Sequence, residues 1–137
     1  MTRRAMNAAA PLMLALALAG CVSAPPPGPL GGNWGGRGVA LTLDARQGRL
    51  EYDCAAGTID GRLLPDAAGR FAATGTHTPG QGGPERIDRP PASFPARYTG
   101  SVRGGEMRLE VDVPARDLHL GPFTLRRGAE AVLLRCL

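Results

Sequence analysis

Apolar and polar side chains alternate in short stretches along most of the chain, and clusters of turn-forming residues separate these stretches. Met107, Leu109 and Val111, for example, alternate with Arg108 and Glu110. A period of two is typical of a β-strand with one buried face. The pattern predicts eight short strands, within residues 39–44, 49–54, 58–64, 71–77, 97–103, 107–113, 118–126 and 130–136.

The short links between these strands indicate how the strands are arranged. Links of hairpin length place consecutive strands antiparallel, and strands with one apolar face must close on themselves or pack against a second sheet. We therefore predict an all-β fold, a small eight-stranded antiparallel meander barrel, with a two-sheet β-sandwich as the alternative. The side chains expected to fill the barrel are Leu41, Tyr52, Phe71, Tyr98, Leu109, Leu125 and Leu134.

The first 20 residues have the pattern of a signal peptide. A basic start precedes an apolar run over residues 8–19, which is shorter than the roughly 20 residues that a membrane-spanning helix needs. The run leads into Leu18-Ala19-Gly20-Cys21, which resembles the lipobox of bacterial lipoproteins. The resemblance implies cleavage before Cys21 and acylation of this residue with palmitate-like chains, which would anchor the protein to a membrane. A secretory signal with an incidental cysteine is the alternative.

The residues after Cys21 bear on where the protein is held. Position 22 is Val, and not the Asp that retains many such lipoproteins at the inner membrane, so we expect the periplasmic face of the outer membrane. The prolines of residues 25–29 favour a stiff, extended linker. The chain thus divides into a signal peptide (1–20), a lipidated cysteine with a linker (21–29) and a β-domain (30–137).

The charge of the chain argues against nucleic acid as a partner. The formal net charge is +4, and all 16 basic residues are arginine. The arginines form no long basic run and are not interleaved with aromatic residues, as they would be on a nucleic-acid-binding surface.

The start of the β-domain carries a family resemblance. Gly32-Asn33-Trp34 resembles the G-x-W motif that opens calycin barrels, such as lipocalins and avidins. The resemblance implies a calycin-like barrel in which Trp34 closes one end and stacks against an arginine of the last strand, where Arg135 lies. Gly35 departs from the apolar continuation that is usual in the family. The whole chain is also similar to a group of uncharacterised bacterial secreted proteins with Trp-Gly-Gly, Tyr-Asp-Cys-Ala-x-Gly and terminal Cys-Leu motifs.

Cys54 and Cys136 are the two cysteines of the β-domain. An even pair of cysteines in an exported domain favours a disulfide bond. The alternative is a metal site or a reactive thiol, for which His77 and His119 are the other soft ligands. Neither histidine lies close in sequence to a cysteine or to the other histidine, whereas zinc ligands usually come in closely spaced pairs. We expect no metal and no cofactor, and we expect His119 to face solvent.

No group of catalytic residues stands out in the sequence. Ser93 and Ser101 do not lie in a nucleophile elbow, and Ser101 has no histidine near it in sequence. Carboxylates such as Glu51 and Asp53 are typical of solvated strand faces and turns. We therefore do not expect an enzyme.

Residues 78–95 form the longest link between predicted strands. A link of 18 residues is much longer than a hairpin needs, and such loops are commonly functional or disordered. Its prolines favour an ordered loop, which Ile87 and Phe94 would anchor over the barrel mouth, and a permissive surface loop is the alternative. The candidate binding residues are Gln81, Glu85, Arg86, Ile87, Asp88, Arg89 and Phe94.

These observations favour a non-enzymatic binding or interaction module of the bacterial envelope, with a protein partner for the 78–95 loop. One alternative is a protease inhibitor, because some periplasmic inhibitors resemble this plan of a barrel with a G-x-W start, one disulfide and an N-terminal stem. Another is a carrier of a small apolar ligand, which requires a barrel interior larger than the core.

Overall fold

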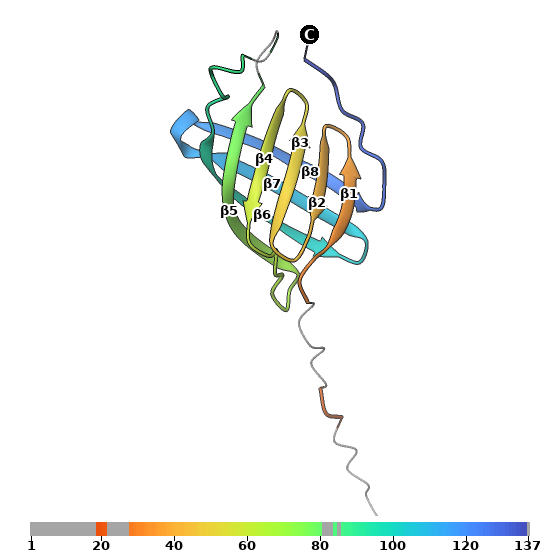
Figure 1. Cartoon of the computed structure of the whole chain (residues 1–137). Coiled ribbons are helices and arrows are strands. Elements are labelled where there is room, and N and C mark those ends of the chain that lie inside the picture. Colours follow the sequence, from red (N-terminus) through yellow and green to blue (C-terminus); the bar gives the residue numbers. More distant parts are fainter. Residues whose placement is uncertain (1–18, 22–27, 81–83, 85, 137) are drawn as a thin grey trace, which may run out of the picture.

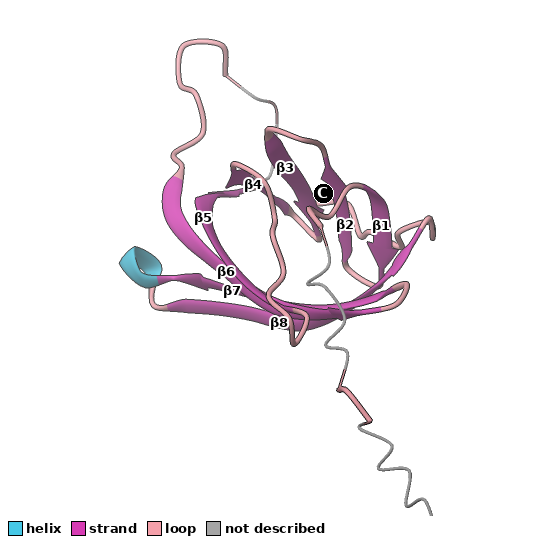
Figure 2. Ribbon diagram, turned by 90° about the horizontal axis from the view of Figure 1, so that it is seen from below, coloured by secondary structure: helices cyan, strands magenta, loops and turns pink. Residues whose placement is uncertain are grey.

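A computed structural model describes residues 19–21, 28–80, 84 and 86–136. Eight antiparallel strands form one closed barrel, in which consecutive strands pair and the last strand also pairs with the first. Figure 2 looks into this ring and shows β6, β7 and β8 along one side. The predicted meander barrel is confirmed, and the sandwich alternative is wrong. The elements are β1 (Gly32–Gly36), β2 (Val39–Leu43), β3 (Gln47–Tyr52), β4 (Ala55–Asp60), β5 (Arg70–Pro79), β6 (Phe94–Arg103), β7 (Glu106–Val113), the 3₁₀ turn η1 (Pro114–Arg116) and β8 (Leu118–Arg127).

The two ends of the barrel differ. The chain enters β1 at a closed end, where the Leu30 N–H donates to the Leu63 carbonyl at 2.9 Å and both side chains are buried. The β1–β2 and β3–β4 turns, the β5–β6 loop and the C-terminus lie at the opposite, open end (Figure 1).

The barrel interior contains one face of each strand, as a period of two requires. Met107, Leu109 and Val111 of β7 are fully buried, which is worth about 1.5–3 kcal/mol for each side chain. Leu134 is an exception to the expected core, because it is 69% exposed on a segment outside the barrel. The other expected core side chains are buried: Leu41, Tyr52, Phe71, Tyr98, Leu109 and Leu125.

Residues 128–136, which we call the C-terminal strap, cross the outside of the barrel and do not form its last strand. Pairing of β1 with β8 has already closed the barrel before the strap begins. An isolated bridge joins Val132 of the strap to Arg37, where the Gly38 N–H donates to the Val132 carbonyl at 2.8 Å and the Val132 N–H donates to the Gly36 carbonyl at 3.1 Å. The predicted strand over 130–136 is therefore wrong. The alternation does not predict the short β1, which is the eighth strand of the barrel in place of residues 130–136.

Gly35 allows the strap to pass close to β1. A Cβ at this position would lie 2.2 Å from the carbonyl oxygen of Ala129 and 2.8 Å from the nitrogen of Ala131. The glycine after Trp34 is therefore required by this close approach.

Trp34 stacks against Arg127 and not against Arg135. Trp34 and Arg127 are register partners across the β1–β8 closure, and the Arg127 guanidinium lies 4.6 Å from the centre of the Trp34 ring. Arg135 is exposed in the strap, beyond the last strand. The predicted Trp34–Arg135 pair is wrong because β8 ends at Arg127.

Candidate functional site

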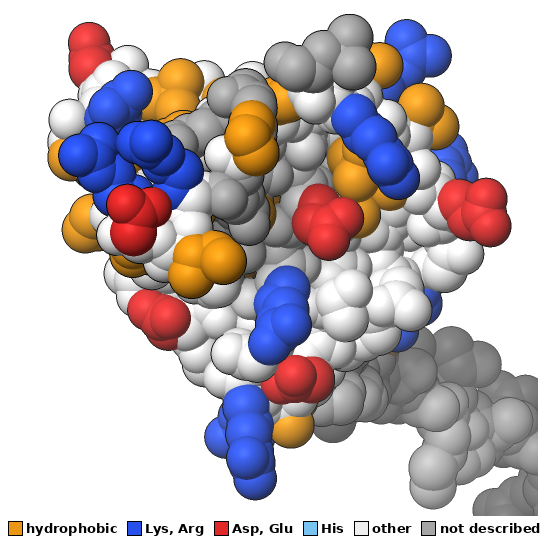
Figure 3. Space-filling view, turned by 45° about the horizontal axis from the view of Figure 1, so that its top comes forward, with side chains coloured by type: hydrophobic (Ala, Val, Ile, Leu, Met, Phe, Trp, Pro, Cys, Tyr) orange, Lys and Arg blue, Asp and Glu red, His pale blue; other side chains and the backbone are white. Residues whose placement is uncertain are grey.

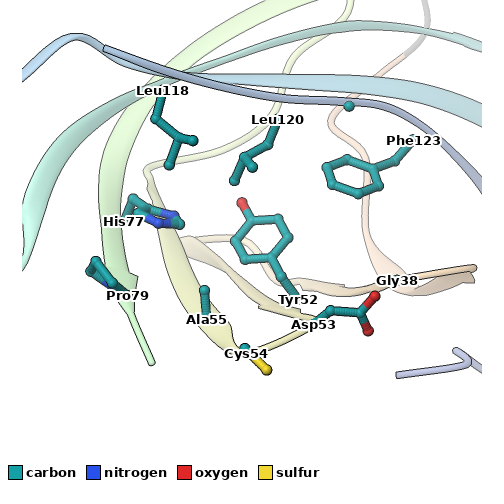
Figure 4. A pocket seen from close by; sticks show the side chains of 11 residues that line it. Gly38, Tyr52, Asp53, Cys54, Ala55, His77, Pro79, Leu118, Leu120 and Phe123 are labelled. Atoms are coloured by element: carbon teal, nitrogen blue, oxygen red, sulfur yellow. The ribbon is translucent and has the colours of Figure 1, made fainter. Parts of the chain in front are cut away.

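A pocket of about 440 Å³ lies at the open end of the barrel. Its lining comes from the β1–β2 and β3–β4 turns, the end of β5 and the first half of β8 (Figure 4). Volumes of this order, with apolar walls and a few polar groups, are usual for small-molecule sites. We call it the mouth pocket. Its lining includes Tyr52, Asp53, His77, Leu118, Leu120 and Phe123.

Tyr52 and His77 place two unsatisfied polar groups at the mouth pocket. Their side chains are 6% and 2% exposed, and their rings lie 5.8 Å apart. Within the part of the chain that the structure describes, neither the Tyr52 hydroxyl nor His77 Nδ1 has a partner within hydrogen-bond distance, although the Tyr98 phenol neighbours the Tyr52 hydroxyl beside Gly57. Leaving a buried polar group unpaired costs about 1–3 kcal/mol. The stability of the barrel therefore does not explain this arrangement.

The second buried tyrosine, Tyr98, is satisfied inside the barrel. Its hydroxyl donates to the Thr76 carbonyl at 2.6 Å. Gly57 leaves room for this contact, because a Cβ there would lie 2.2 Å from the Tyr98 oxygen. Burial raises the pKa of Tyr52 far above its usual range, and the neighbouring Tyr98 phenol raises it further. Tyr52 is therefore a neutral hydroxyl at physiological pH.

His77 is neutral as well. Burial lowers the pKa of its imidazole, and the positive charge of Arg116 lowers it further. The Arg116 guanidinium lies 5.0 Å from the ring centre of Phe94, which is the register partner of His77 on β6. A neutral imidazole has one nitrogen that donates and one that accepts a hydrogen bond.

The sequence alone does not predict the meeting of Tyr52 and His77. The alternation does place each side chain on the inner face of its strand, because His77 is in phase with Phe71 and Tyr52 with Leu50. The two strands are separated by β4, however, so only the curvature of the closed sheet brings the rings together.

The predicted disulfide bond between Cys54 and Cys136 is confirmed. It joins the β3–β4 turn to the C-terminal strap at the rim of the mouth pocket. Next to it, the Leu134 N–H donates to Asp53 Oδ1 at 2.6 Å. These two links hold the strap against the open end.

The loop between β5 and β6 is shorter than predicted. It spans residues 80–93, because β5 extends to Pro79 and β6 begins at Phe94. Phe94 packs against the core as a strand residue, whereas Ile87 is fully exposed. The prediction that Ile87 anchors the loop over the mouth is wrong, since this side chain makes no buried contact.

Two of the polar candidates of this loop, Arg86 and Arg89, line one pocket. Gln81 and Glu85 lie outside the described residues, and Asp88 is exposed. This pocket has a volume of about 180 Å³ and lies beside the end of β5. Figure 3 shows charges of both signs on this side of the molecule, with a group of arginine side chains at one edge.

His119 faces solvent, as predicted, and is not part of the mouth pocket. Its Nδ1 lies 2.6 Å from Asp112 Oδ1, and this hydrogen bond raises the pKa of His119. Among the described residues, no three or more His, Cys, Asp and Glu side chains are grouped so that they could hold a metal ion.

Cys21 is exposed and is not part of the disulfide bond. The remainder of the predicted linker up to residue 27, and with it most of the stem on which the protease-inhibitor prediction depends, falls outside the described residues. Over the residues that are described, no helix has the length and apolarity needed to cross a membrane.

Comparisons with protein-family models, curated proteins and solved structures found no match to this chain.

Proposed function

We propose that the protein is a lipid-anchored, non-enzymatic binding protein of the bacterial envelope, and that it binds a small, mainly apolar molecule in the mouth pocket. One observation carries the proposal: the pocket of about 440 Å³ has apolar walls and two buried polar groups without partners. A ligand gains from the apolar walls, and a polar atom on it would satisfy groups that are costly to leave unpaired. This favours the small-ligand carrier over a function of the loop.

The direction in which the pocket opens suits an anchored protein. Residues 28–31 lead into β1 at the closed end, and the mouth pocket is at the other end (Figure 1). Lipid chains on Cys21 would therefore hold the pocket on the side of the barrel away from the membrane. The Cys21→Ser variant should move from the membrane fraction to the soluble fraction, and unchanged partitioning would contradict the anchor.

Ligand binding can be tested with N-phenyl-1-naphthylamine, an apolar dye that fluoresces in apolar sites. The purified protein should bind the dye, and Leu120→Trp should abolish binding by filling the pocket. Leu64→Trp is the matched control, because Leu64 is 62% exposed and does not line the pocket. A dye signal that is absent, or that Leu120→Trp leaves unchanged, would contradict the proposal.

A protein partner for the 78–95 loop is a second candidate function. The observation in its favour is the complete exposure of Ile87, a large apolar side chain, next to Arg86. Crosslinking in intact cells should then capture a partner that Ile87→Ser loses. A partner set that is the same for the wild type and this variant would argue against the loop.

A further inference from the structure

Two buried polar atoms belong to the lining of the mouth pocket. Among the described residues, the Tyr52 hydroxyl and His77 Nδ1 are the buried side-chain polar atoms without partners, and their rings lie 5.8 Å apart. In Figure 4 the Tyr52 hydroxyl points toward Leu118 and Leu120, and the His77 ring lies on the same side of the pocket. A single ligand group between these residues can therefore meet both polar atoms once the two half-buried leucines move aside.

The two sides of the mouth pocket also differ in charge. Arg116, through its position over Phe94, adds positive charge on the His77 side. The carboxylate of Asp53 lines the other side of the pocket (Figure 4), where it accepts the Leu134 N–H. An anionic group is thus favoured beside His77 and disfavoured beside Asp53.

We propose that the mouth pocket binds small apolar carboxylates, and that the ligand carboxylate accepts hydrogen bonds from the Tyr52 hydroxyl and from His77 Nδ1. This inference rests on the proposed function, because it names the ligand class of the same pocket. The apolar part of the ligand then packs along Leu118, Leu120 and Phe123.

A carboxylate fits these two residues better than other polar groups. A neutral phenol donates one hydrogen bond, and a neutral imidazole with its proton on Nδ1 donates a second, so the ligand group must offer two acceptors at one point. An alcohol oxygen can also accept two hydrogen bonds but carries no charge to strengthen them, and an ammonium group has no lone pair with which to accept them. Hydrogen bonds to an ionised acceptor are also stronger than neutral ones, which offsets the cost of taking the carboxylate out of water.

Titration calorimetry with decanoate and decan-1-ol tests the proposal, because these compounds differ only at the polar end. The purified protein should bind decanoate at least about tenfold more tightly than decan-1-ol. Tyr52→Phe should weaken decanoate binding by about tenfold and change decan-1-ol binding by less than about threefold. His77→Gln is a second variant and should also act mainly on decanoate.

Tyr98→Phe is the matched control, since it removes a buried phenol oxygen that already donates inside the barrel. It should leave the preference for decanoate intact. Equal binding of decanoate and decan-1-ol by the wild type, or equal effects of Tyr52→Phe and Tyr98→Phe, would overturn the carboxylate assignment alone. Failure of both compounds and of N-phenyl-1-naphthylamine to bind would overturn the proposed function as well.

Discussion

The guanidinium of Arg127 lies 4.6 Å from the centre of the Trp34 ring, and the two residues are partners across the strand pair that closes the barrel. The contact therefore joins the first strand to the last. Trp34 is 1% exposed, so its ring is held by the core on one face and by the arginine on the other.

Loss of this contact should weaken the barrel. We expect Arg127→Ala to lower the free energy of unfolding by about 0.5–1 kcal/mol, because Arg127 is an exposed residue whose cation–π contact and stem packing are both lost. Arg135→Ala, in the exposed strap, should change it by less than about 0.5 kcal/mol. Urea denaturation followed by circular dichroism measures both, and equal losses would contradict the assignment of Arg127.

Removal of the hydroxyl should change the stability of the barrel differently at the two buried tyrosines. Tyr98→Phe removes the hydrogen bond to the Thr76 carbonyl and should cost about 1 kcal/mol of stability. Tyr52→Phe removes a hydroxyl without a partner and should leave stability unchanged or raise it by up to about 1 kcal/mol. Thermal denaturation of the two variants without ligand separates these outcomes. A larger loss in Tyr52→Phe would show that its hydroxyl is paired.

The two histidines should titrate on opposite sides of the ordinary histidine pKa, which is about 6.5. Burial and Arg116 lower the pKa of His77, so the unfolded chain takes up this proton first and stability falls as the pH drops below about 6.5. The hydrogen bond to Asp112 raises the pKa of His119, so its contribution is present below about 6.5 and is lost as the pH rises through the folded-state pKa. NMR titration of the imidazole signals measures both shifts.

Asp112→Asn provides the control for this titration. It should bring the pKa of His119 back toward 6.5 and leave the pKa of His77 unchanged, because Asp112 contacts only the first of these rings. Two histidines that titrate together near 6.5 would contradict both environments.

The disulfide bond should stabilise the barrel because it lowers the conformational entropy of the unfolded chain. The bonded cysteines are 82 residues apart, and the chain-entropy estimate for a loop of this length is about 4 kcal/mol. The double variant Cys54→Ser, Cys136→Ser should lose stability of this order and should expose the amides of residues 132–136 to faster hydrogen exchange. Strap amides that exchange at the wild-type rate would show that hydrogen bonds hold the strap without the disulfide bond.

Local patterns in the sequence determined the class of the fold and much of its core. Alternation in β7 predicted the burial of Met107, Leu109 and Val111, because the period of a strand depends only on its own backbone. The hairpin-length links made the strands antiparallel neighbours. The pair of cysteines predicted the disulfide bond between Cys54 and Cys136. This prediction needs no register, because it requires only that the two cysteines come close together in the fold.

Tertiary structure decided which segment closes the barrel and where the candidate site lies. Residues 130–136 alternate like a strand, but β1 is already paired with β8, and a closed sheet has no free edge for them. Because β8 closes the barrel, Trp34 stacks against Arg127 and not against the predicted Arg135. It also brought Tyr52 of β3 and His77 of β5 together across β4, because the distance between strands that do not pair depends on the curvature of the whole barrel and on no local period.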